Sequence, residues 1–286
     1  MKPLSEGYNL TTEVNHFDLS YDDIGSGDMP IIFLHGYPFD KTMWEGQLQF
    51  LRSSYRVIAI DIRGFGASRD EQSLLSIDMF ADDVISFMNK LEIEKAIICG
   101  LSMGGFIALN ALSRFSDRFE ALILCDTQCI ADTAEVKAKR YKTIDEIKAN
   151  GPDDFNEGFI KSVFHKDSLI QMPEIVEAVR NVVFSNSQQI IINGLIALAE
   201  RSETCTTLGR IAVPTLIICG REDVVTPLPQ SDYMHEHIKG SLLRIIENAG
   251  HVSNLEHQYE FNKILFDFLT SLKVAYTALA EAGNRG

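Results

Sequence analysis

The segment AIICGLSMGGFIALN, residues 96–110, decides how the rest of the sequence is interpreted. It begins with an apolar run of strand length and ends with a run of helical composition. Between the two lies the pattern G-x-S-x-G, which places Ser102 on a tight turn from a strand into a helix. A serine on such a turn has a strained backbone, and the strand and the helix approach closely, so neighbouring positions need minimal side chains. Gly100, Gly104 and Gly105 satisfy that requirement, and we predict a strand–turn–helix unit with Ser102 at its turn.

The alternation of strand and helix continues on both sides of this segment. Near-continuous apolar runs, typical of strands buried on both faces, occur at residues 31–34, 56–60, 96–99, 121–125, 215–219 and 242–246. Helical patterns cover residues 76–91, 103–115 and 255–272, while residues 12–23 alternate and carry charge, as an antiparallel edge hairpin does. The pattern predicts an α/β protein with a mostly parallel, doubly wound sheet.

A long stretch between two of these strands has a different pattern. Residues 131–208 are helical and charged and contain no buried-strand run. An unstructured loop of that length is implausible in a compact domain, so we predict a helical cap inserted over one end of the sheet. The resulting division is a first core part at residues 1–130, the cap at 131–208, a second core part at 209–273 and a flexible tail at 274–286.

Composition limits the partners that the protein can have. The chain has 286 residues, 26 Lys and Arg against 40 Asp and Glu, and a formal net charge of −14. Such a surface repels phosphate backbones and anionic lipids, so we expect a small-molecule partner and neither nucleic acid nor membrane. The N-terminal residues lack an apolar leader, and no run of about 18 apolar residues is present.

The cysteines and histidines do not form a ligand pattern. The five cysteines are odd in number and have no paired or metal-ligand spacing: Cys99, Cys125, Cys129, Cys205 and Cys219. We therefore expect reduced cysteines, a cytoplasmic location, and neither a metal site nor a cofactor.

Two further candidate residues follow apolar strands near the C-terminus. Asp223 comes directly after the strand at 215–219, and His251 follows the strand at 242–246. Both therefore lie at the carboxyl ends of parallel strands, the same edge as Ser102. A neutral imidazole can take the serine proton while a buried carboxylate fixes the imidazole tautomer, so we predict Ser102 as nucleophile, His251 as base and Asp223 as acid. Glu222 and Asp126 are the alternative acids.

Several motifs together resemble a known family. They are HGYP at 35–38, D-x-R-G-x-G-x-S at 61–68, GLSMGG at 100–105, GREDVVTP at 220–227 and AGHVSNLE at 249–256. In combination they are similar to single-domain α/β hydrolases, especially the carboxylesterase and β-ketoadipate enol-lactonase branch. The resemblance covers residues 31–129 and 211–272, reaches the end of the cap at 194–220, and is weak over 133–187. It implies the α/β-hydrolase fold and hydrolysis of a small-molecule ester or lactone through an acyl-enzyme.

The resemblance also implies where the oxyanion of the reaction is bound. In this fold one backbone N–H comes from the loop after the first parallel strand and another from the residue after the nucleophile. These positions are Tyr37 and Met103 in this sequence. We interpret His35 as a structural histidine bonded to nearby backbone, and residues 61–68 as a structural glycine-rich turn.

The sequence leaves the exact reaction open. Ester hydrolysis ranks first and enol-lactone hydrolysis second; carbon–carbon hydrolysis and perhydrolysis use the same three residues, and a ligand receptor on this fold is the alternative from another class. A lactone of the β-ketoadipate type carries a carboxylate and needs a cation in its pocket. Arg201 is the best candidate for that cation, although Glu200 or Glu203 can pair with it, and the basic residues Lys137, Lys139, Arg140 and Lys142 have the spacing of a solvated helix face. We therefore expect neutral esters to be the better substrates.

Overall fold

The chain forms one eight-stranded sheet that is mostly parallel. The structure, a computed structural model, describes residues 7–27, 29–71 and 73–283, with side chains in the last helix described as far as Val274. The strand order is β1-β2-β4-β3-β5-β6-β7-β8, and only β1 and β2 run antiparallel to their neighbours. The strands are β1 (Gly7–Val14), β2 (Phe17–Ile24), β3 (Ile31–Leu34), β4 (Val57–Ile60), β5 (Ala96–Leu101), β6 (Phe119–Cys125), β7 (Thr215–Gly220) and β8 (Leu242–Ile246). The predicted parallel strands and edge hairpin are confirmed, but β8 is not buried on both faces as expected: it is an edge strand, and its Leu242 and Arg244 are exposed.

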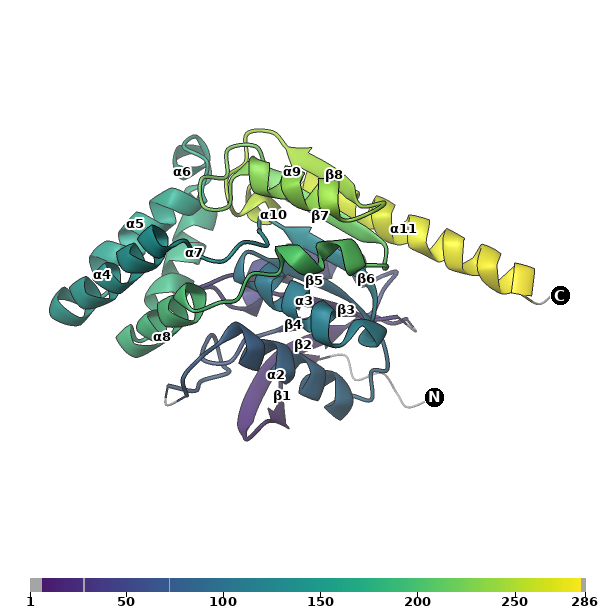
Figure 1. Ribbon diagram of the computed structural model, residues 1–286, viewed down its shortest axis with the longest axis horizontal. Coiled ribbons are helices and arrows are strands. Elements are labelled where there is room, and N and C mark those ends of the chain that lie inside the picture. The colour runs from purple at the N-terminus through teal and green to yellow at the C-terminus, as the bar shows by residue number, and fades with distance from the viewer. Residues whose placement is uncertain (1–6, 28, 72, 284–286) are drawn as a thin grey trace.

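Helices cover both faces of this sheet and form two separate cores (Figure 1). Because successive side chains of a strand point to opposite faces, Ile32 and Leu34 of β3 pack with α2 and α3, while Ile31 and Phe33 pack with α1 and α11. A strand that is buried in this way on both faces must be apolar at every position. The helices outside the cap are α1 (Glu45–Leu51), α2 (Ile77–Lys90), α3 (Met103–Arg114), α9 (Leu228–His237), α10 (Ser253–Glu256) and α11 (Gln258–Gly283).

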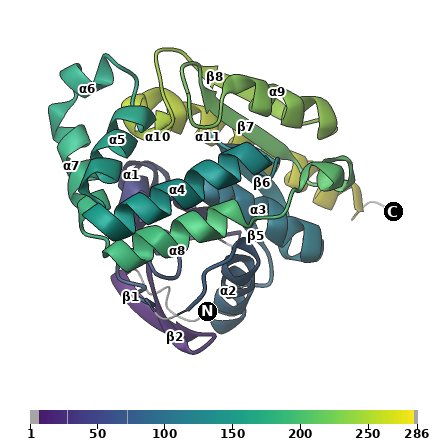
Figure 2. The same ribbon diagram turned by 60° about the vertical axis from the view of Figure 1, so that its left-hand side comes forward.

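Five α-helices lie between β6 and β7, inside the range expected for the cap, and a 3₁₀ helix (Cys205–Arg210) follows them. The α-helices are α4 (Ala134–Asn150), α5 (Asp153–Val163), α6 (Ser168–Gln171), α7 (Pro173–Phe184) and α8 (Gln188–Ala199). The side chains of Thr133 and Ser187 cap the first turns of α4 and α8, which pack against each other (Figure 2). The helices gather at one end of the sheet (Figure 1). The division into core and cap remains our interpretation of this arrangement.

Among the described residues, no single helix is long and apolar enough to cross a membrane. Taken together, α7 and α8 would be long and apolar enough to do so, but the two helices meet at an angle of 94°.

The last helix extends further than the sequence analysis predicted. We expected it to end at residue 272, whereas α11 continues to Gly283. The added segment, VAYTALAEAG, is rich in alanine, the residue with the highest helix propensity, and this explains the extension. The flexibility expected for residues 274–286 remains a prediction, and residues 284–286 lie outside the described residues.

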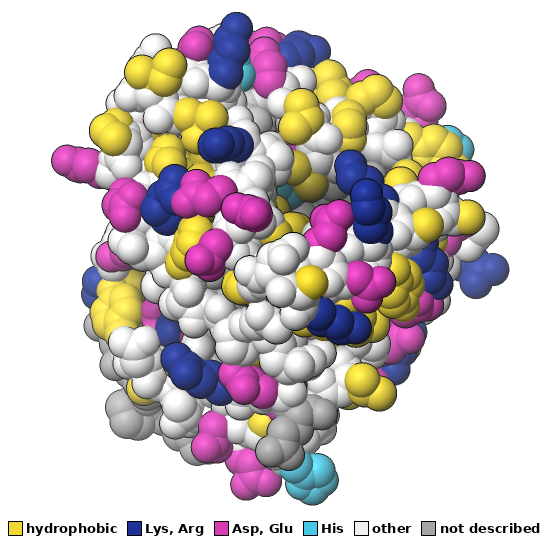
Figure 3. Space-filling model, turned by 90° about the vertical axis from the view of Figure 1, so that its left-hand side faces the viewer, with side chains coloured by type: hydrophobic (Ala, Val, Ile, Leu, Met, Phe, Trp, Pro, Cys, Tyr) yellow, Lys and Arg dark blue, Asp and Glu magenta, His cyan; other side chains and the backbone are white. Residues whose placement is uncertain are grey.

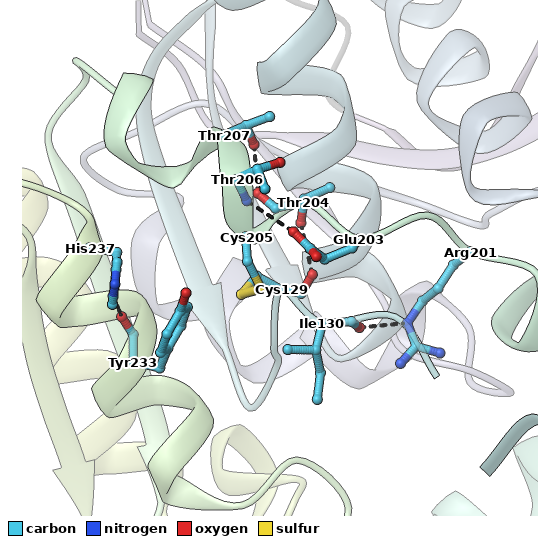
Figure 4. Close-up of a disulfide and its surroundings, with 10 residues drawn as sticks. All are labelled: Cys129, Ile130, Arg201, Glu203, Thr204, Cys205, Thr206, Thr207, Tyr233 and His237. Carbon is cyan, nitrogen blue, oxygen red and sulfur yellow. Dashed lines mark hydrogen bonds between the residues drawn. A yellow bond between two sulfur atoms is a disulfide. The ribbon is translucent and has the colours of Figure 1, made fainter. Parts of the chain in front are cut away.

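The prediction that all cysteines are reduced is wrong. Cys129 and Cys205 form a disulfide (Figure 4). Cys99, Cys125 and Cys219 are free and buried. The bonded pair is 76 residues apart in sequence, yet the two Cα atoms are 4.9 Å apart. The cap chain leaves the sheet after β6 and returns before β7, the neighbouring strand, so its two ends meet. Sequence spacing cannot reveal such a pair.

Candidate active site

Ser102 has the strained backbone that its motif requires. It lies between β5 and α3 with φ 54° and ψ −115°. Its N–H donates to the carbonyl oxygen of Cys125 at 3.0 Å, and its carbonyl oxygen accepts the hydroxyl of Thr127 at 2.8 Å. A Cβ atom at Gly100 or at Gly104 would lie 2.2 Å from a backbone oxygen, so both positions require glycine. The turn therefore holds Ser102 rigidly, with 9% of the residue exposed.

The loops after β7 and β8 bring His251 and Asp223 together. His251 Nδ1 and Asp223 Oδ2 are 2.8 Å apart, and both side chains are buried. Thr226 donates its hydroxyl to Asp223 Oδ2 at 2.7 Å, and its N–H donates to Oδ1 at 3.0 Å. The carboxylate thus accepts several donors in addition to the imidazole, which fixes its orientation.

The two groups stabilise each other's charged forms. Burial lowers the pKa of His251, but the charge of Asp223 and the hydrogen bond to it outweigh burial, so the pKa lies above its usual value. Burial raises the pKa of Asp223, but His251 and the donors from Thr226 outweigh burial, and the pKa is lowered. Asp223 is therefore an anion over the range in which His251 changes its charge.

Neither alternative acid hydrogen bonds to His251. Glu222 is exposed, and its N–H donates to Ala249. Asp126 is buried, but its carboxyl bonds to the N–H of Gly220 at 2.7 Å and to the hydroxyl of Ser253 at 2.5 Å. Of the three acids considered from the sequence, Asp223 is the one whose carboxylate hydrogen bonds to His251.

The loop after β3 lies beside Ser102. A Cβ atom at Gly36 would be 3.1 Å from Ser102 Cβ, so this loop passes directly next to the serine. Tyr37 and Met103 are both buried, and neither backbone N–H donates a turn, loop or cap hydrogen bond among the described residues. Both N–H groups therefore remain candidates for holding an oxyanion.

His35 and the glycine-rich turn have structural roles, as expected. His35 Nε2 accepts the N–H of Ile62 at 2.9 Å, which leaves Nδ1 to donate to the carbonyl oxygen of Gly36 at 2.8 Å. Burial lowers the pKa of His35 and favours this neutral form. In the turn, the carboxylate of Asp61 accepts the N–H of Ala67 and pairs with buried Lys41.

Aromatic side chains link this loop to the cap. The ring of Tyr37 contacts those of Phe155 and Phe159 from α5, with centroids 6.4 and 6.2 Å away, and its hydroxyl donates to Ile191 of α8. Phe159 also contacts Phe39, at 5.6 Å. Sequence analysis did not identify these residues, because helical phenylalanines look the same whether they face a site or a core.

The guanidinium of the candidate cation Arg201 is already bound within the protein, and it shares its carboxylate partner with Arg140. Its guanidinium donates to Asp132 Oδ1 at 2.6 Å and to the carbonyl oxygens of Leu198 and Ile130, and it lies over the ring of Phe106 (Figure 4 shows the bond to Ile130). Burial is the largest influence on its pKa and lowers it. The expectation that Arg201 pairs with Glu200 or Glu203 was wrong, because the guanidinium of Arg201 binds Asp132 at the other end of the cap.

The basic residues of α4 lie in a mixture of charges. Lys137 pairs with Glu200, Arg140 with Asp132, and Lys142 with Glu146. Figure 3 shows acidic and basic side chains interspersed over the end of the molecule that carries the cap. These residues match the solvated face that their spacing predicted.

One group of side chains has the composition of a metal site. Among the described residues, ligand atoms of Asp126, Cys219 and Asp223 lie within 4.8 Å of one another. Both carboxylates already accept hydrogen bonds from the protein, so we interpret the group as part of the hydrogen-bond network around His251.

Known proteins resemble the chain in sequence and in structure. A family model described as the alpha/beta hydrolase fold matches residues 29–171. The 3-oxoadipate enol-lactonase 2 of Acinetobacter baylyi is 32% identical over 85% of this chain and 90% of its own length. A thermophilic esterase from Thermogutta terrifontis has a TM-score of 0.86 and 30% identity, over 92% of this chain and 97% of that one. An enol-lactonase from Burkholderia xenovorans has a TM-score of 0.85 and 26% identity, over 91% of this chain and 100% of that one.

Proposed function

The chain belongs to the α/β-hydrolase family, and we propose that it hydrolyses carboxylic esters of small molecules with Ser102, His251 and Asp223 as its catalytic residues. The observation that carries this proposal is the strained turn of Ser102 at the same sheet edge as the buried pair of His251 and Asp223. The esterase and lactonase relatives support the same class of reaction.

The geometry of His251 assigns the proton transfers. Nδ1 donates to Asp223, so Nε2 is left as the acceptor for the Ser102 proton. Attack of the serine oxygen on the ester carbonyl forms a tetrahedral intermediate, and the Nε2 proton then passes to the departing alcohol. Water, deprotonated by the same nitrogen, releases the acid from the acyl-enzyme and restores Ser102.

We assign the oxyanion of that intermediate to the backbone N–H groups of Tyr37 and Met103. The loop of Tyr37 lies directly beside Ser102, and Met103 is the first residue of α3. The start of a helix presents unpaired N–H groups and the positive end of its dipole, both of which stabilise developing negative charge.

Enol-lactone hydrolysis is the second candidate, because two of the similar proteins are enol-lactonases. The same residues would open a lactone ring without releasing a separate alcohol. The donors of Arg201 are already bound to Asp132 and to two carbonyl oxygens, which argues against a carboxylate-bearing lactone, so we rank neutral esters first.

A cytoplasmic location also remains a proposal. Three free, buried cysteines fit it, whereas the Cys129–Cys205 disulfide is typical of oxidising compartments. Alkylating free thiols during cell lysis and mapping them would distinguish the two, since a reduced Cys129 supports the cytoplasm.

Covalent labelling tests the catalytic assignment. We expect a fluorophosphonate probe to modify Ser102, as mapped by peptide mass spectrometry, and Ser102→Ala to abolish both labelling and turnover of p-nitrophenyl acetate. Labelling of another serine, or full esterase activity in Ser102→Ala, would refute the assignment. A receptor on this fold would release about one equivalent of nitrophenol and then stall.

A further inference from the structure

The end of β6 contacts the loops of all three proposed catalytic residues. The carbonyl oxygen of Cys125 accepts the N–H of Ser102 at 3.0 Å, and the hydroxyl of Thr127 donates to the carbonyl oxygen of Ser102 at 2.8 Å. Asp126 lies between these two residues, so the same short segment that holds the nucleophile also carries a buried carboxyl.

That carboxyl joins the two other loops. Asp126 Oδ1 accepts the N–H of Gly220, three residues before Asp223, at 2.7 Å. Its Oδ2 accepts the hydroxyl of Ser253, two residues after His251, at 2.5 Å. Asp126 and Ser253 have no exposed surface, and Asp126 has a positive φ of 44°, a backbone conformation that residues with a Cβ atom rarely adopt.

We propose that Asp126 is a positioning residue, which holds the loops of Asp223 and His251 in register with Ser102. This role rests on the proposed function of those three residues. Asp126 does not touch the reacting atoms: it acts through Gly220 and Ser253, each bonded to a different oxygen of one rigid carboxyl. A shift of about 1 Å between base and nucleophile costs about 100-fold in rate, so such a link matters for catalysis.

The surroundings of Asp126 determine its charge. The groups that face it are Asp223, His251, Cys219 and Cys125, and Glu256 acts on His251 from α10. Burial and, next, the charge of Asp223 raise the pKa of Asp126 to about 8. Asp126 is therefore mostly neutral at pH 7, with its proton in the short hydrogen bond between Oδ2 and Ser253, and of the two aspartates near the imidazole Asp223 is the anion. Above that pKa Asp126 becomes a second anion, which stabilises the imidazolium that forms in the transition state.

The side-chain chemistry of asparagine separates the two parts of this role. In Asp126→Asn, the amide oxygen can still accept from Gly220 and the NH₂ group can donate to Ser253, but the residue cannot ionise. In Asp126→Ala, both partners lose their hydrogen bond and remain buried. Ser253→Ala removes the link to the His251 loop alone.

The experiment measures kcat and KM for p-nitrophenyl acetate from pH 6 to 9.5 in these variants, corrected for spontaneous hydrolysis, together with thermal unfolding and fluorophosphonate labelling. For Asp126→Ala we expect kcat to fall about 100-fold with a small change in KM. For Asp126→Asn and Ser253→Ala we expect a decrease of about fivefold, as for one altered hydrogen bond. Wild-type kcat should be about threefold higher above pH 8 than at pH 7, because Asp126 ionises near a pKa of about 8, and Asp126→Asn should lack this rise.

A matched control separates positioning from general stability. Asp83 is another buried aspartate, which accepts a hydrogen bond from Arg63 at 2.7 Å, and Asp83→Ala should lower the melting temperature without altering how kcat depends on pH.

The proposal is overturned if Asp126→Asn keeps the alkaline rise in kcat, or if kcat falls by the same factor in Asp126→Asn and Asp126→Ala. If Asp126→Ala does not fold, the kcat values of Asp126→Asn and Ser253→Ala test the proposal instead: wild-type kcat in both variants would overturn it. Absence of Ser102 labelling in the wild type would overturn the proposed function itself, whereas labelled Ser102 with wild-type kcat in Asp126→Ala would overturn the positioning role alone.

Discussion

At the scale of single residues, the buried anion of Asp223 sets the pH at which His251 can act. A general base must be neutral, and the pKa of His251 lies above its usual value because Asp223 stabilises the imidazolium. Activity should therefore disappear as the pH falls through this raised pKa. The same shift means that the His251–Asp223 pair stabilises the fold most at low pH, while Asp223 is still ionised, and that this contribution is lost as the pH rises through the pKa of His251.

This gives a prediction for the acid. We expect the acidic limb of kcat/KM in the wild type to have a midpoint above about 6.5, the ordinary histidine value. Asp223→Asn should lower kcat about 10⁴-fold, because the imidazole loses the partner that fixes its tautomer. Stopped-flow hydrolysis of p-nitrophenyl acetate across pH 5–9 measures both. A more damaging effect of Asp126→Asn than of Asp223→Asn would mean that the acid lies after β6 instead.

Which residues could be recognised from the sequence depended on local pattern. The glycines beside Ser102 are required by close backbone contacts, and Asp223 and His251 each come shortly after an apolar strand. Thr226 had a usable signal, since a threonine three residues after Asp223 can bond back to its carboxylate. The contacts of Asp126 gave no signal, because they join three loops that are far apart in the sequence.

At the scale of helices and strands, the two ends of the cap are linked by several contacts. The disulfide joins Cys129 to Cys205 (Figure 4), and Asp132 pairs with Arg201. Thr204 adds a hydrogen bond from its N–H to the carbonyl oxygen of Cys129 at 2.9 Å. The ends of the inserted helices are therefore held together independently of how the helices pack on the sheet.

Removing the disulfide should destabilise the fold without abolishing it. A bond that closes a loop of this length stabilises a protein by about 2–4 kcal/mol, mainly by restricting the unfolded chain. We expect the double variant Cys129→Ser, Cys205→Ser to melt at a lower temperature than the wild type and to be insensitive to dithiothreitol, whereas the wild type loses stability in the reductant. Cys99→Ala is the control, a buried free cysteine that should leave the reductant response intact. Equal melting temperatures for the wild type with and without reductant would contradict this prediction.

The element order of the sheet was predictable because β3 to β7 are buried on both faces and so appear as short apolar runs, whereas the edge strand β8, with Leu242 and Arg244 exposed, is apolar for most of its length without being buried in this way. The insertion was predictable for the converse reason, since charged helical segments cannot form such strands. The link between Cys129 and Cys205 and the pairing of Arg201 with Asp132 were not, because they depend on where the cap returns to the sheet. Local sequence specifies elements better than it specifies contacts between distant loops.

At the scale of the whole molecule, the net charge acts on every substrate that approaches. With a formal charge of −14, the protein repels anions over distances comparable to the Debye length, about 8 Å at physiological salt. Basic side chains of the cap offset this charge only in part: Lys137 is paired with Glu200, and Arg140 and Arg201 share the single carboxylate of Asp132.

Neutral esters should therefore be hydrolysed more efficiently than esters that carry a carboxylate on the acyl group. We expect kcat/KM for p-nitrophenyl butyrate to exceed that for its ω-carboxylate analogue at least tenfold at low salt, a difference of about 1.4 kcal/mol in transition-state stabilisation. Added salt should reduce this ratio, because it screens the repulsion and so raises kcat/KM for the anion.

Lys139→Ala is the control for a general change of surface charge. It should lower kcat/KM for the anion only slightly, since this exposed lysine lies on α4. Arg201→Ala should lower the melting temperature, because it leaves the buried carboxylate of Asp132 with one ion pair fewer. It should lower kcat/KM for the neutral ester and for the anion by the same factor. A preference for the anion that is lost selectively in Arg201→Ala would reverse this ranking, because Arg201 would then have to release Asp132 to bind the substrate carboxylate, and the enol-lactonase activity would become the first candidate.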